Sequence, residues 1–336
     1  MSAPLPEATL ETAAADREIL FVLGSARSGT TFLNNFLDRW FDYGMGPEGT
    51  FVEPFHQRLE RYGDLTQPAN LKRLVDDVSR CQMLEIMRKK YRDSKKLDVT
   101  PEAILARVPD PSYAGVVYGV FRAIADLQGK SRVGNKNPGY WTHLGLLGSL
   151  FPRNARYIAI LRDGRDVFLS LQGTPWGGHS PYAAATRWRQ ALESIETFRA
   201  SCGPDRFLLL RYEDLLQDPA AAIGQIEALL GVPLAPERRA AALAEAQSNP
   251  KKGNFYKWPD RMPAKDRRVF EAVAGDLLAA HGYEVLPQRP KLSMAERVWF
   301  RLLELKRLLA VNLYHLRNKL PGDTKKRKAR EAAPRA

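Results

Sequence analysis

Residues 20–33 read Leu20-Phe21-Val22-Leu23-Gly24-Ser25-Ala26-Arg27-Ser28-Gly29-Thr30-Thr31-Phe32-Leu33, which is an apolar run, a glycine-containing turn and the start of an amphipathic segment. This order predicts a buried parallel strand that passes through a tight turn into a helix. Such a turn leaves backbone N–H groups pointing outward at the positive end of the helix dipole, and together they form an anion site. Gly24 and Gly29 also have the spacing of a phosphate-binding loop.

One feature of an ATP site is missing from this loop. Nucleoside-triphosphate loops carry Lys-Ser or Lys-Thr after the second glycine, whereas this chain has Thr30-Thr31. The only cation within the loop is Arg27. We therefore expect the segment to bind phosphate but not ATP. The alternative is an ordinary strand-to-helix turn in an α/β protein that binds no nucleotide.

A second anion site is expected after the apolar run of residues 155–161, where the chain reads Arg162-Asp163-Gly164-Arg165-Asp166-Val167-Phe168-Leu169-Ser170. Ligands of open parallel sheets bind at the carboxyl edge of the strands, where Arg162 would lie. Asp163 or Asp166 can cap the helix that follows. Ser170 lies four residues after Asp166, on the same helix face. A guanidinium and a hydroxyl in this relation can hold one phosphate; the alternative is a surface cluster of ion pairs.

These segments together resemble the sulfotransferases that use 3′-phosphoadenosine 5′-phosphosulfate (PAPS), in the arginine-loop form of tyrosylprotein and many bacterial members. The resemblance covers residues 18–286. Its further segments, in family order, are Asn135-Lys136-Asn137-Pro138, Arg211-Tyr212-Glu213-Asp214-Leu215, Lys251-Lys252-Gly253 and Gly282-Tyr283. It implies an α/β fold with a parallel sheet of the P-loop NTPase type and helices on both faces. It also implies transfer of a sulfuryl group from PAPS to an acceptor hydroxyl by in-line displacement, with release of 3′,5′-ADP.

The resemblance also implies roles for individual residues. Lys136 would support the sulfuryl group and the bridging oxygen, next to Arg27. Phe32 would lie against the adenine or, alternatively, in the core. The implied PAPS-binding residues are Arg27, Ser28, Gly29, Thr30, Thr31, Phe32, Arg162, Ser170, Tyr212, Lys251, Lys252 and Gly253.

The acceptor hydroxyl needs a general base near the transferring sulfur. The arginine-loop relatives use a glutamate downstream of the loop arginine, and Glu48 follows Arg27 by 21 residues. Glu48 is therefore the first candidate. Glu53 is the second and could exchange roles with it, and His56 is the third.

The composition fits one sizeable enzyme domain. With 336 residues, 44% of them apolar, the chain can bury one large core. Cys81 and Cys202 are too few for a disulfide framework and favour a reducing compartment. No apolar run has the length of a membrane span, and the N-terminus lacks a secretory signal pattern. We therefore expect a cytoplasmic enzyme. The five histidines lack metal-ligand spacing, so no metal site is expected.

The net charge of +13 is concentrated toward the C-terminus. Residues 291–336 hold 13 basic and 4 acidic side chains, so they carry +9 and the other residues only +4. A mildly basic body argues against nucleic acid as a partner. Residues 295–320 read as an amphipathic helix, and Lys325-Lys326-Arg327-Lys328-Ala329-Arg330 follows. Residues 295–330 would therefore suit the surface of an anionic membrane and place the enzyme at its periphery. The alternative is a helix packed on the domain or on a second subunit.

The expected organisation is a disordered leader over 1–17, a sulfotransferase domain over 18–290, a basic amphipathic helix over 291–320 and a basic disordered tail over 321–336. Hydrophobic spacing predicts helices over 30–43, 71–91, 113–128, 182–200 and 264–281. Strands are predicted over 19–23, 131–134, 155–161 and 206–210. Strands that alternate with helices indicate a parallel sheet covered on both faces. Residues 44–61 are expected to form an irregular active-site loop.

The acceptor is the least determined part of the function. Segments 44–61, 71–91 and 173–179 are expected to line its pocket. Trp141 and Trp176 are available to stack on sugar rings, so a glycan or glycolipid is favoured. The alternative function is a P-loop nucleotide kinase or NTPase, against which the missing lysine after Gly29 argues. A non-enzymatic module that binds PAPS or its desulfated product is a third hypothesis. The sequence does not indicate an oligomeric state.

Overall fold

The computed structural model describes residues 17–90, 99–174, 180–248 and 254–319. The chain divides into two compact units. The first contains Met1–Asp163 and Gln190–Tyr256, and the second contains Gly164–Arg189 and Lys257–Ala336. The boundary crosses helix α10 (Pro181–Cys202). The predicted leader and tail lie almost wholly outside the described residues, so both stay predictions.

The first unit is built on a five-stranded sheet in the order β2-β3-β1-β4-β5, and every pairing is parallel. The strands are β1 (Ile19–Gly24), β2 (Tyr43–Met45), β3 (Arg132–Lys136), β4 (Ala155–Leu161) and β5 (Phe207–Arg211). Val22 on β1 lies opposite Lys136 on β3, and Gly24 lies opposite Ile160 on β4. The carboxyl ends of these three neighbouring strands therefore meet at one edge of the sheet. The predicted α/β class and parallel sheet are confirmed.

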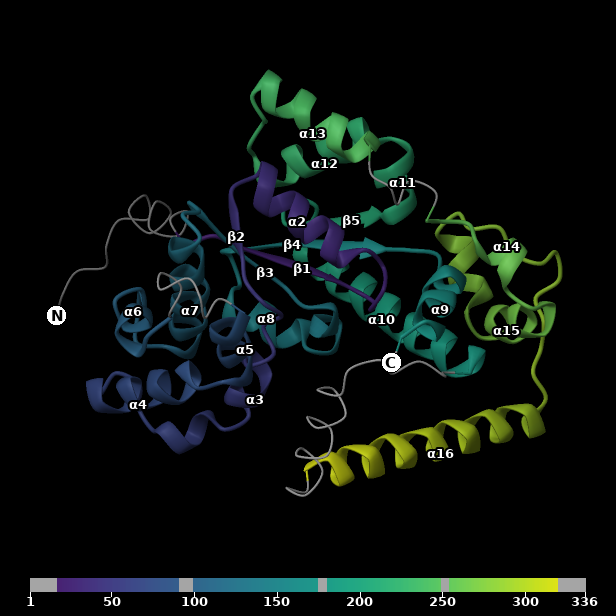
Figure 1. The fold of residues 1–336 in the computed structure, drawn as a ribbon, viewed down its shortest axis with the longest axis horizontal. Coiled ribbons are helices and arrows are strands. Elements are labelled where there is room, and N and C mark those ends of the chain that lie inside the picture. The colour runs from purple at the N-terminus through teal and green to yellow at the C-terminus, as the bar shows by residue number, and fades with distance from the viewer. Residues whose placement is uncertain (1–16, 91–98, 175–179, 249–253, 320–336) are drawn as a thin grey trace, which may run out of the picture. The chain divides into compact units, whose positions relative to one another are not determined.

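Helices cover both faces of the sheet, as predicted (Figure 1). Alternate residues of β1 point to opposite faces. Ile19, Phe21 and Leu23 pack into one hydrophobic cluster, and Leu20 and Val22 pack into the other. The first cluster draws on α4 (Pro68–Ser79), α5 (Gln82–Lys90), α6 (Pro101–Leu105), α7 (Tyr113–Leu127), α8 (Leu144–Leu150) and α10. The second draws on α2 (Thr30–Trp40), α11 (Tyr212–Gln217), α12 (Pro219–Leu230) and α13 (Pro236–Ser248).

The helix predicted over 30–43 is too long. It ends at Trp40, because Asp42 turns the chain with a φ of 59° and residues Tyr43–Met45 form β2. The Asp42 carboxylate accepts hydrogen bonds from the backbone N–H and the hydroxyl of Ser131, at 3.1 and 2.6 Å. This contact fixes the start of β2 beside β3.

Two other predictions in this unit are wrong. Residues 44–61 are not an irregular loop, because they hold the end of β2, helix α3 (Val52–His56) and the 3-10 helix η1 (Leu59–Tyr62). The helix predicted over 71–91 is two helices, α4 and α5. The break is stabilised by Arg88, whose Nη2 donates to the carbonyl oxygen of Ser79 at 2.6 Å. A guanidinium on a terminal carbonyl is a common way to end a helix.

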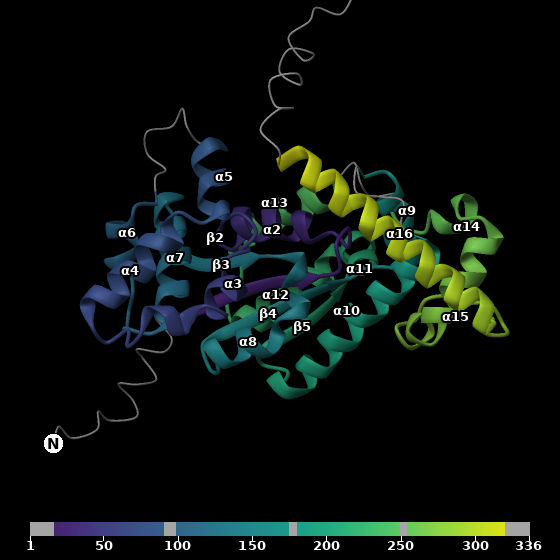
Figure 2. The ribbon, with the colours of Figure 1, turned by 90° about the horizontal axis from the view of Figure 1, so that it is seen from below.

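The second unit is helical. It contains α9 (Gly164–Gln172), the start of α10, α14 (Trp258–Arg261), α15 (Ala264–Ala280) and α16 (Met294–Lys319), which is one continuous helix (Figure 2). Arg165 is fully buried in this unit. Its Nη1 forms an ion pair with Oε1 of Glu271 at 2.8 Å, and its guanidinium carbon lies 3.5 Å from the ring centroid of Trp258. Asp166 accepts the backbone N–H groups of Lys257 and Trp258, both at 3.0 Å. Within the described residues, no helix is both long enough and apolar enough to cross a membrane.

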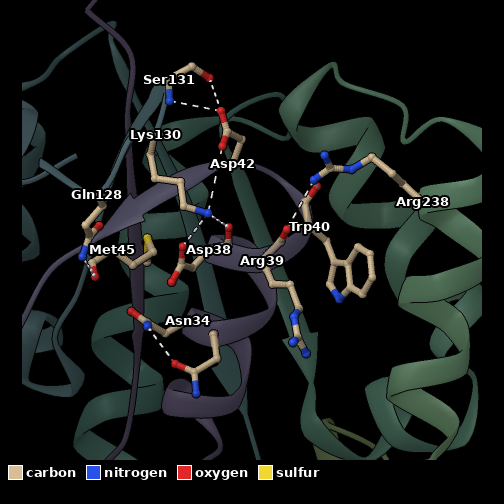
Figure 3. A network of polar contacts seen from close by, with 11 residues as sticks. Asn34, Asp38, Arg39, Trp40, Asp42, Met45, Gln128, Lys130, Ser131 and Arg238 are labelled. Carbon is tan, nitrogen blue, oxygen red and sulfur yellow. Dashed lines mark hydrogen bonds and ion pairs between the residues drawn. The ribbon is translucent and has the colours of Figure 1, made fainter. Parts of the chain in front are cut away.

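Helix α2 is held at its C-terminal end by basic side chains from the loop before β3 and from α13 (Figure 3). Lys130 donates to the carbonyl oxygen of Asp38 at 2.5 Å and pairs with its carboxylate at 2.8 Å. Arg238 of α13 donates to the carbonyl oxygen of Trp40 at 2.9 Å. Cations at this end bind carbonyls that the helix leaves unpaired and complement its dipole. The helix that begins at the predicted anion loop is thus fixed at its far end.

Candidate active site

The loop between β1 and α2 has the backbone geometry of an anion site. Gly24, Arg27 and Gly29 all have positive φ angles, of 152°, 72° and 102°. A Cβ atom on Gly24 would lie 2.5 Å from the carbonyl oxygen of Ile160, so only glycine fits there. Helix α2 begins at Thr30, and Gly29 at its N-cap supplies no side-chain hydrogen bond. The first N–H groups of α2 therefore point toward a potential ligand rather than toward a capping side chain.

The ring of Tyr212 packs against this loop at Gly29. Tyr212 is buried, and its ring would lie 2.4 Å from a Cβ atom at Gly29. Among the residues predicted to bind the phosphosulfate, Arg27 and Thr31 are exposed, whereas Ser28 and Thr30 are buried. The Ser28 and Ser25 hydroxyls are 2.5 Å apart.

Phe32 is half-buried, and its ring is 6.3 Å from that of Phe36. The second core cluster includes Phe36, and Phe32 packs against that cluster.

Arg162 links three segments of the first unit. It follows β4 and is buried, and its guanidinium lies 4.9 Å from the ring centroid of Tyr212. It donates to the carbonyl oxygens of Arg27, at 3.1 Å, and Asn254, at 2.5 Å. The structure thus joins the anion loop to the residue that follows the predicted basic-glycine segment.

The other residues predicted to hold the 3′-phosphate are not placed relative to Arg162. Residues 251–253, with Lys251, Lys252 and Gly253, lie outside the described residues. Ser170 lies half-buried on α9, in the second unit. The predicted roles of these residues therefore stay predictions.

The structure brings together two candidate catalytic residues that are 88 positions apart in the sequence. Lys136 is the last residue of β3, and its Nζ lies 2.7 Å from Oε1 of Glu48. The Lys136 side chain is 10% exposed, whereas that of Glu48 is 48% exposed. The lysine is therefore held inside the sheet edge, and the carboxylate stays accessible to a second molecule.

The loop that carries Glu48 is fixed by Asn135, a residue to which the sequence analysis gave no role. The fully buried Asn135 accepts the backbone N–H of Gly49 at 3.0 Å and donates to the carbonyl oxygen of Pro47 at 2.9 Å. Its Oδ1 also accepts the hydroxyl of Tyr140 at 2.7 Å. Burial raises the pKa of Tyr140 well above its usual value, so this phenol keeps the proton that it donates. Both neighbours of Glu48 are therefore attached to one side chain.

The other two base candidates lie on α3. Glu53 is half-buried and accepts a hydrogen bond from the side chain of Gln57. His56 is exposed, and its ring is 5.8 Å from that of Tyr113. Of the three candidates, Glu48 is the one that contacts Lys136.

A cavity of about 220 Å³ lies next to this pair. Gly49 and Asn137 line it, and they directly follow Glu48 and Lys136 in the sequence. The other lining residues are Thr50, Val52, Glu53, Pro54, Gly139, Tyr140, Thr142, His143 and Leu147. The cavity is therefore lined by part of segment 44–61, which was expected to line the acceptor pocket, and by six residues between 137 and 147, none of which was expected there.

Part of the predicted acceptor pocket cannot be compared with this cavity, because residues 175–179, which include Trp176, lie outside the described residues. In the described parts of the chain, no three His, Cys, Asp or Glu side chains are grouped so that they could hold a metal ion.

Known proteins are similar to this chain in sequence. The sequence pattern of the sulfotransferase family matches residues 20–236, a range that includes the anion loop, Glu48, Lys136 and Arg162. Nodulation protein NoeE of Sinorhizobium fredii (strain NBRC 101917 / NGR234) is 27% identical over 236 residues, which cover 63% of this chain and 50% of NoeE. Carbohydrate sulfotransferase 3 of Tetronarce californica is 27% identical over 176 residues, which cover 43% of this chain and 39% of that protein. The chain thus spans half or less of the length of these two relatives.

A solved structure has the same fold. The sulfotransferase domain from the Synechococcus PCC 7002 olefin synthase superposes with a TM-score of 0.51 at 21% identity, over 80% of this chain and 96% of that domain. The family pattern spans more than half of the chain and carries the residues that meet at the sheet edge. The chain belongs to the sulfotransferase family, as its sequence motifs indicated.

Proposed function

We propose that this sulfotransferase moves the sulfuryl group of PAPS to the hydroxyl of an acceptor and releases 3′,5′-ADP. The observation that carries the proposal is the Lys136–Glu48 pair, 2.7 Å apart. It lies at the same sheet edge as the anion loop, because Lys136 on β3 pairs with β1, which leads into that loop.

The loop fits an anionic nucleotide. The uncapped start of α2 offers N–H groups, and the close approach of Tyr212 to Gly29 leaves room for backbone only. Arg27, Ser28, Thr30 and Thr31 would hold the phosphosulfate end. Arg162, Ser170 and the segment 251–253 would hold the 3′-phosphate, and Phe32 and Tyr212 would complete the nucleotide site.

In the proposed chemistry, Glu48 acts as the general base and Lys136 as a cation that stabilises negative charge. PAPS supplies the sulfuryl group, and the acceptor oxygen bonds to sulfur as the bond from sulfur to the phosphate oxygen breaks. Glu48 takes the acceptor proton, and its half-exposed carboxylate can reach that hydroxyl. Lys136 and Arg27 stabilise the negative charge that spreads over the transferring group and the departing oxygen. Glu53 and His56 remain the second and third candidates for the base.

For the acceptor, we propose a carbohydrate, free or lipid-linked. The cavity beside Glu48 is lined by hydroxyl, amide, carboxylate and imidazole groups as well as by the ring of Tyr140, which suits a polyhydroxylated ring. The name of one relative, carbohydrate sulfotransferase 3, points to the same class of acceptor. Trp141 and Trp176 remain candidates for stacking on sugar faces.

We further propose that the enzyme works in the cytoplasm, at the periphery of a membrane. Cys81 and Cys202 are both free, which suits a reducing compartment. The peripheral location rests on α16.

Ligand-dependent thermal stability tests the nucleotide assignment. A ligand that binds only the folded state raises the melting temperature. We expect 3′,5′-ADP to raise it and ATP with Mg²⁺ to leave it unchanged. Stabilisation by ATP–Mg²⁺ alone would contradict the proposal and favour the nucleotide kinase or NTPase alternative. Binding of 3′,5′-ADP without transfer to any acceptor in a carbohydrate panel would support the binding-module hypothesis instead.

A further inference from the structure

Helix α16 presents an apolar stripe to solvent. Large apolar side chains recur at intervals of three or four residues, which places them on one helix face. Each of them is at least 50% exposed: Met294, Val298, Leu302, Leu305 and Leu309. Trp299, at the edge of this stripe, is 60% exposed. Soluble proteins rarely leave so much contiguous apolar surface uncovered unless it binds something.

The opposite face of α16 is the one that packs on its own unit. Phe300 stacks on Tyr182 with their ring centroids 5.5 Å apart, and Glu296 forms an ion pair with Arg268 of α15. Glu296 also accepts the backbone N–H of Ser293 at 2.8 Å. These contacts fix the rotation of the helix. The apolar stripe is therefore not the face by which α16 attaches to the second unit.

The acidic side chains of α16 and two of its exposed basic side chains lie on different faces of the helix. Its two carboxylates between residues 294 and 309 are both neutralised, because Glu296 pairs with Arg268 and Glu304 pairs with Arg307 at 2.6 Å. Helical geometry puts Glu296 nearly opposite the apolar stripe and Glu304 about 120° from its centre, so both point away from the stripe. Arg301 and Lys306 are exposed and flank the stripe on its two sides. The surface around the stripe is therefore basic.

We propose that the apolar stripe of α16 docks on the surface of an anionic membrane. Arg301 and Lys306 are placed to reach lipid phosphates while the leucines enter the interface, and the acidic side chains face away from it. The sequence after the helix adds charge of the same sign, since five of the six residues 325–330 are basic. A second protein copy would bury the stripe without needing this arrangement of charge, so a lipid surface explains more of the observations.

Vesicle flotation tests the proposal with the full chain and needs neither nucleotide nor acceptor, so its result is independent of the sulfotransfer assignment. We expect flotation with vesicles of phosphatidylserine and phosphatidylcholine, less flotation at high salt, and little with phosphatidylcholine alone. The double variant Leu302→Glu/Leu305→Glu should lower the partition coefficient more than about tenfold, because two apolar anchors are lost and two negative charges are added.

A matched control is offered by α13, where Ala241 and Ala244 are exposed. The double variant Ala241→Glu/Ala244→Glu makes the same change of charge and should float like the unmodified chain. Equal flotation of the α16 variant and this control would overturn the proposal. So would a dimer in light scattering that becomes monomeric only in the α16 variant, with no flotation, since a second copy would then cover the stripe.

A second inference concerns Asn135 and rests on the proposed function. Its amide holds the carbonyl oxygen of Pro47 and the N–H of Gly49, the residues on either side of Glu48. A Cβ atom on Gly49 would lie 2.6 Å from Oδ1 of Asn135, so the loop and the amide fit closely. We infer that Asn135 is a positioning residue, which fixes the Glu48 carboxylate at Lys136.

A double-mutant cycle between Asn135 and Glu48 separates positioning from a general structural role. Asn135→Ala should lower kcat by roughly 10–100-fold, because a displaced base loses most of the advantage of orientation. In the Glu48→Gln background the same change should have little effect, since the base on which it acts is already gone. Affinity for 3′,5′-ADP should not change.

A control variant and two opposite outcomes make the cycle decisive. Tyr140→Phe keeps the ring, removes one donor to Asn135 and leaves the amide bonds to Pro47 and Gly49, so it should cost less than Asn135→Ala. Additive losses of kcat would overturn the positioning role while leaving the base assignment intact. An unaltered kcat in Glu48→Gln itself would instead contradict the assignment of the base.

Discussion

Replacing Glu48 by glutamine tests the proposed base with little disturbance of the fold. The carboxylate is half-exposed and contacts Lys136 at 2.7 Å, and the amide oxygen of glutamine can still accept that hydrogen bond. The Lys136 side chain is only 10% exposed, but the glutamine amide keeps it hydrogen-bonded, so the melting temperature should fall only modestly. Turnover should fall by about 10²–10⁴-fold, the usual effect of losing a general base. That range corresponds to about 2.7–5.4 kcal/mol of activation free energy.

The assay is the release of 3′,5′-ADP from PAPS in the presence of a carbohydrate acceptor, with nucleotide affinity measured separately by calorimetry. Glu53→Gln is the matched control, because it makes the same chemical change on neighbouring helix α3. Full activity of Glu48→Gln would refute the reasoning. If Glu53→Gln shows the loss instead, the two glutamates exchange roles. If both variants keep full turnover, His56 becomes the candidate.

Two further predictions concern the nucleotide site and the pH dependence of stability. Arg162→Ala should weaken 3′,5′-ADP binding by roughly tenfold or more in calorimetry, since a charge-assisted hydrogen bond contributes about 1.5–3 kcal/mol; an unchanged affinity would exclude Arg162 from the phosphate site. Burial raises the pKa of Asp42, but the hydrogen bonds from Ser131 and the charges of Lys130 and Arg238 outweigh it, so the pKa lies below its usual value. The lowered pKa stabilises the fold above the unfolded-state pKa of about 3.9, and this contribution is lost as the pH falls through the folded-state value. Asp42→Asn should therefore lower the melting temperature modestly at pH 7 and progressively less on acidification; a difference that grows toward low pH would contradict this sign.

The elements that the sequence predicted best are those whose signal is local. β4 has the predicted bounds, and α7 and α10 differ from theirs by at most two residues. Their apolar periodicity lies within one continuous segment, so no distant contact is needed to recognise it. The anion loop was also predictable, because Gly24 and Gly29 adopt positive φ angles that the turn requires and that glycine adopts without strain.

The parts that the sequence did not predict depend on distant contacts. Residues Tyr43–Met45 form a strand because β3 lies beside them. The carboxylate of Asp42, at the turn before β2, accepts a hydrogen bond from Ser131, which is 89 positions away. Asn135 follows the same rule, since its partners Pro47 and Gly49 are 88 and 86 positions distant. A three-residue strand and a single buried amide leave no periodic signal in the sequence.

The short strand β2 is also what assembles the candidate site. Met45 lies opposite Gly134 in the parallel ladder between β2 and β3. From these paired positions the two chains run in the same direction, so Lys136, two residues after Gly134, and Glu48, three residues after Met45, emerge at the same edge. Asn135, between Gly134 and Lys136, then ties the backbone on both sides of Glu48 to β3. A shift of one residue in this pairing would turn the side chains to the other face of the sheet and separate the carboxylate from the lysine. The register of the shortest strand in the sheet therefore determines whether the base and the cation meet.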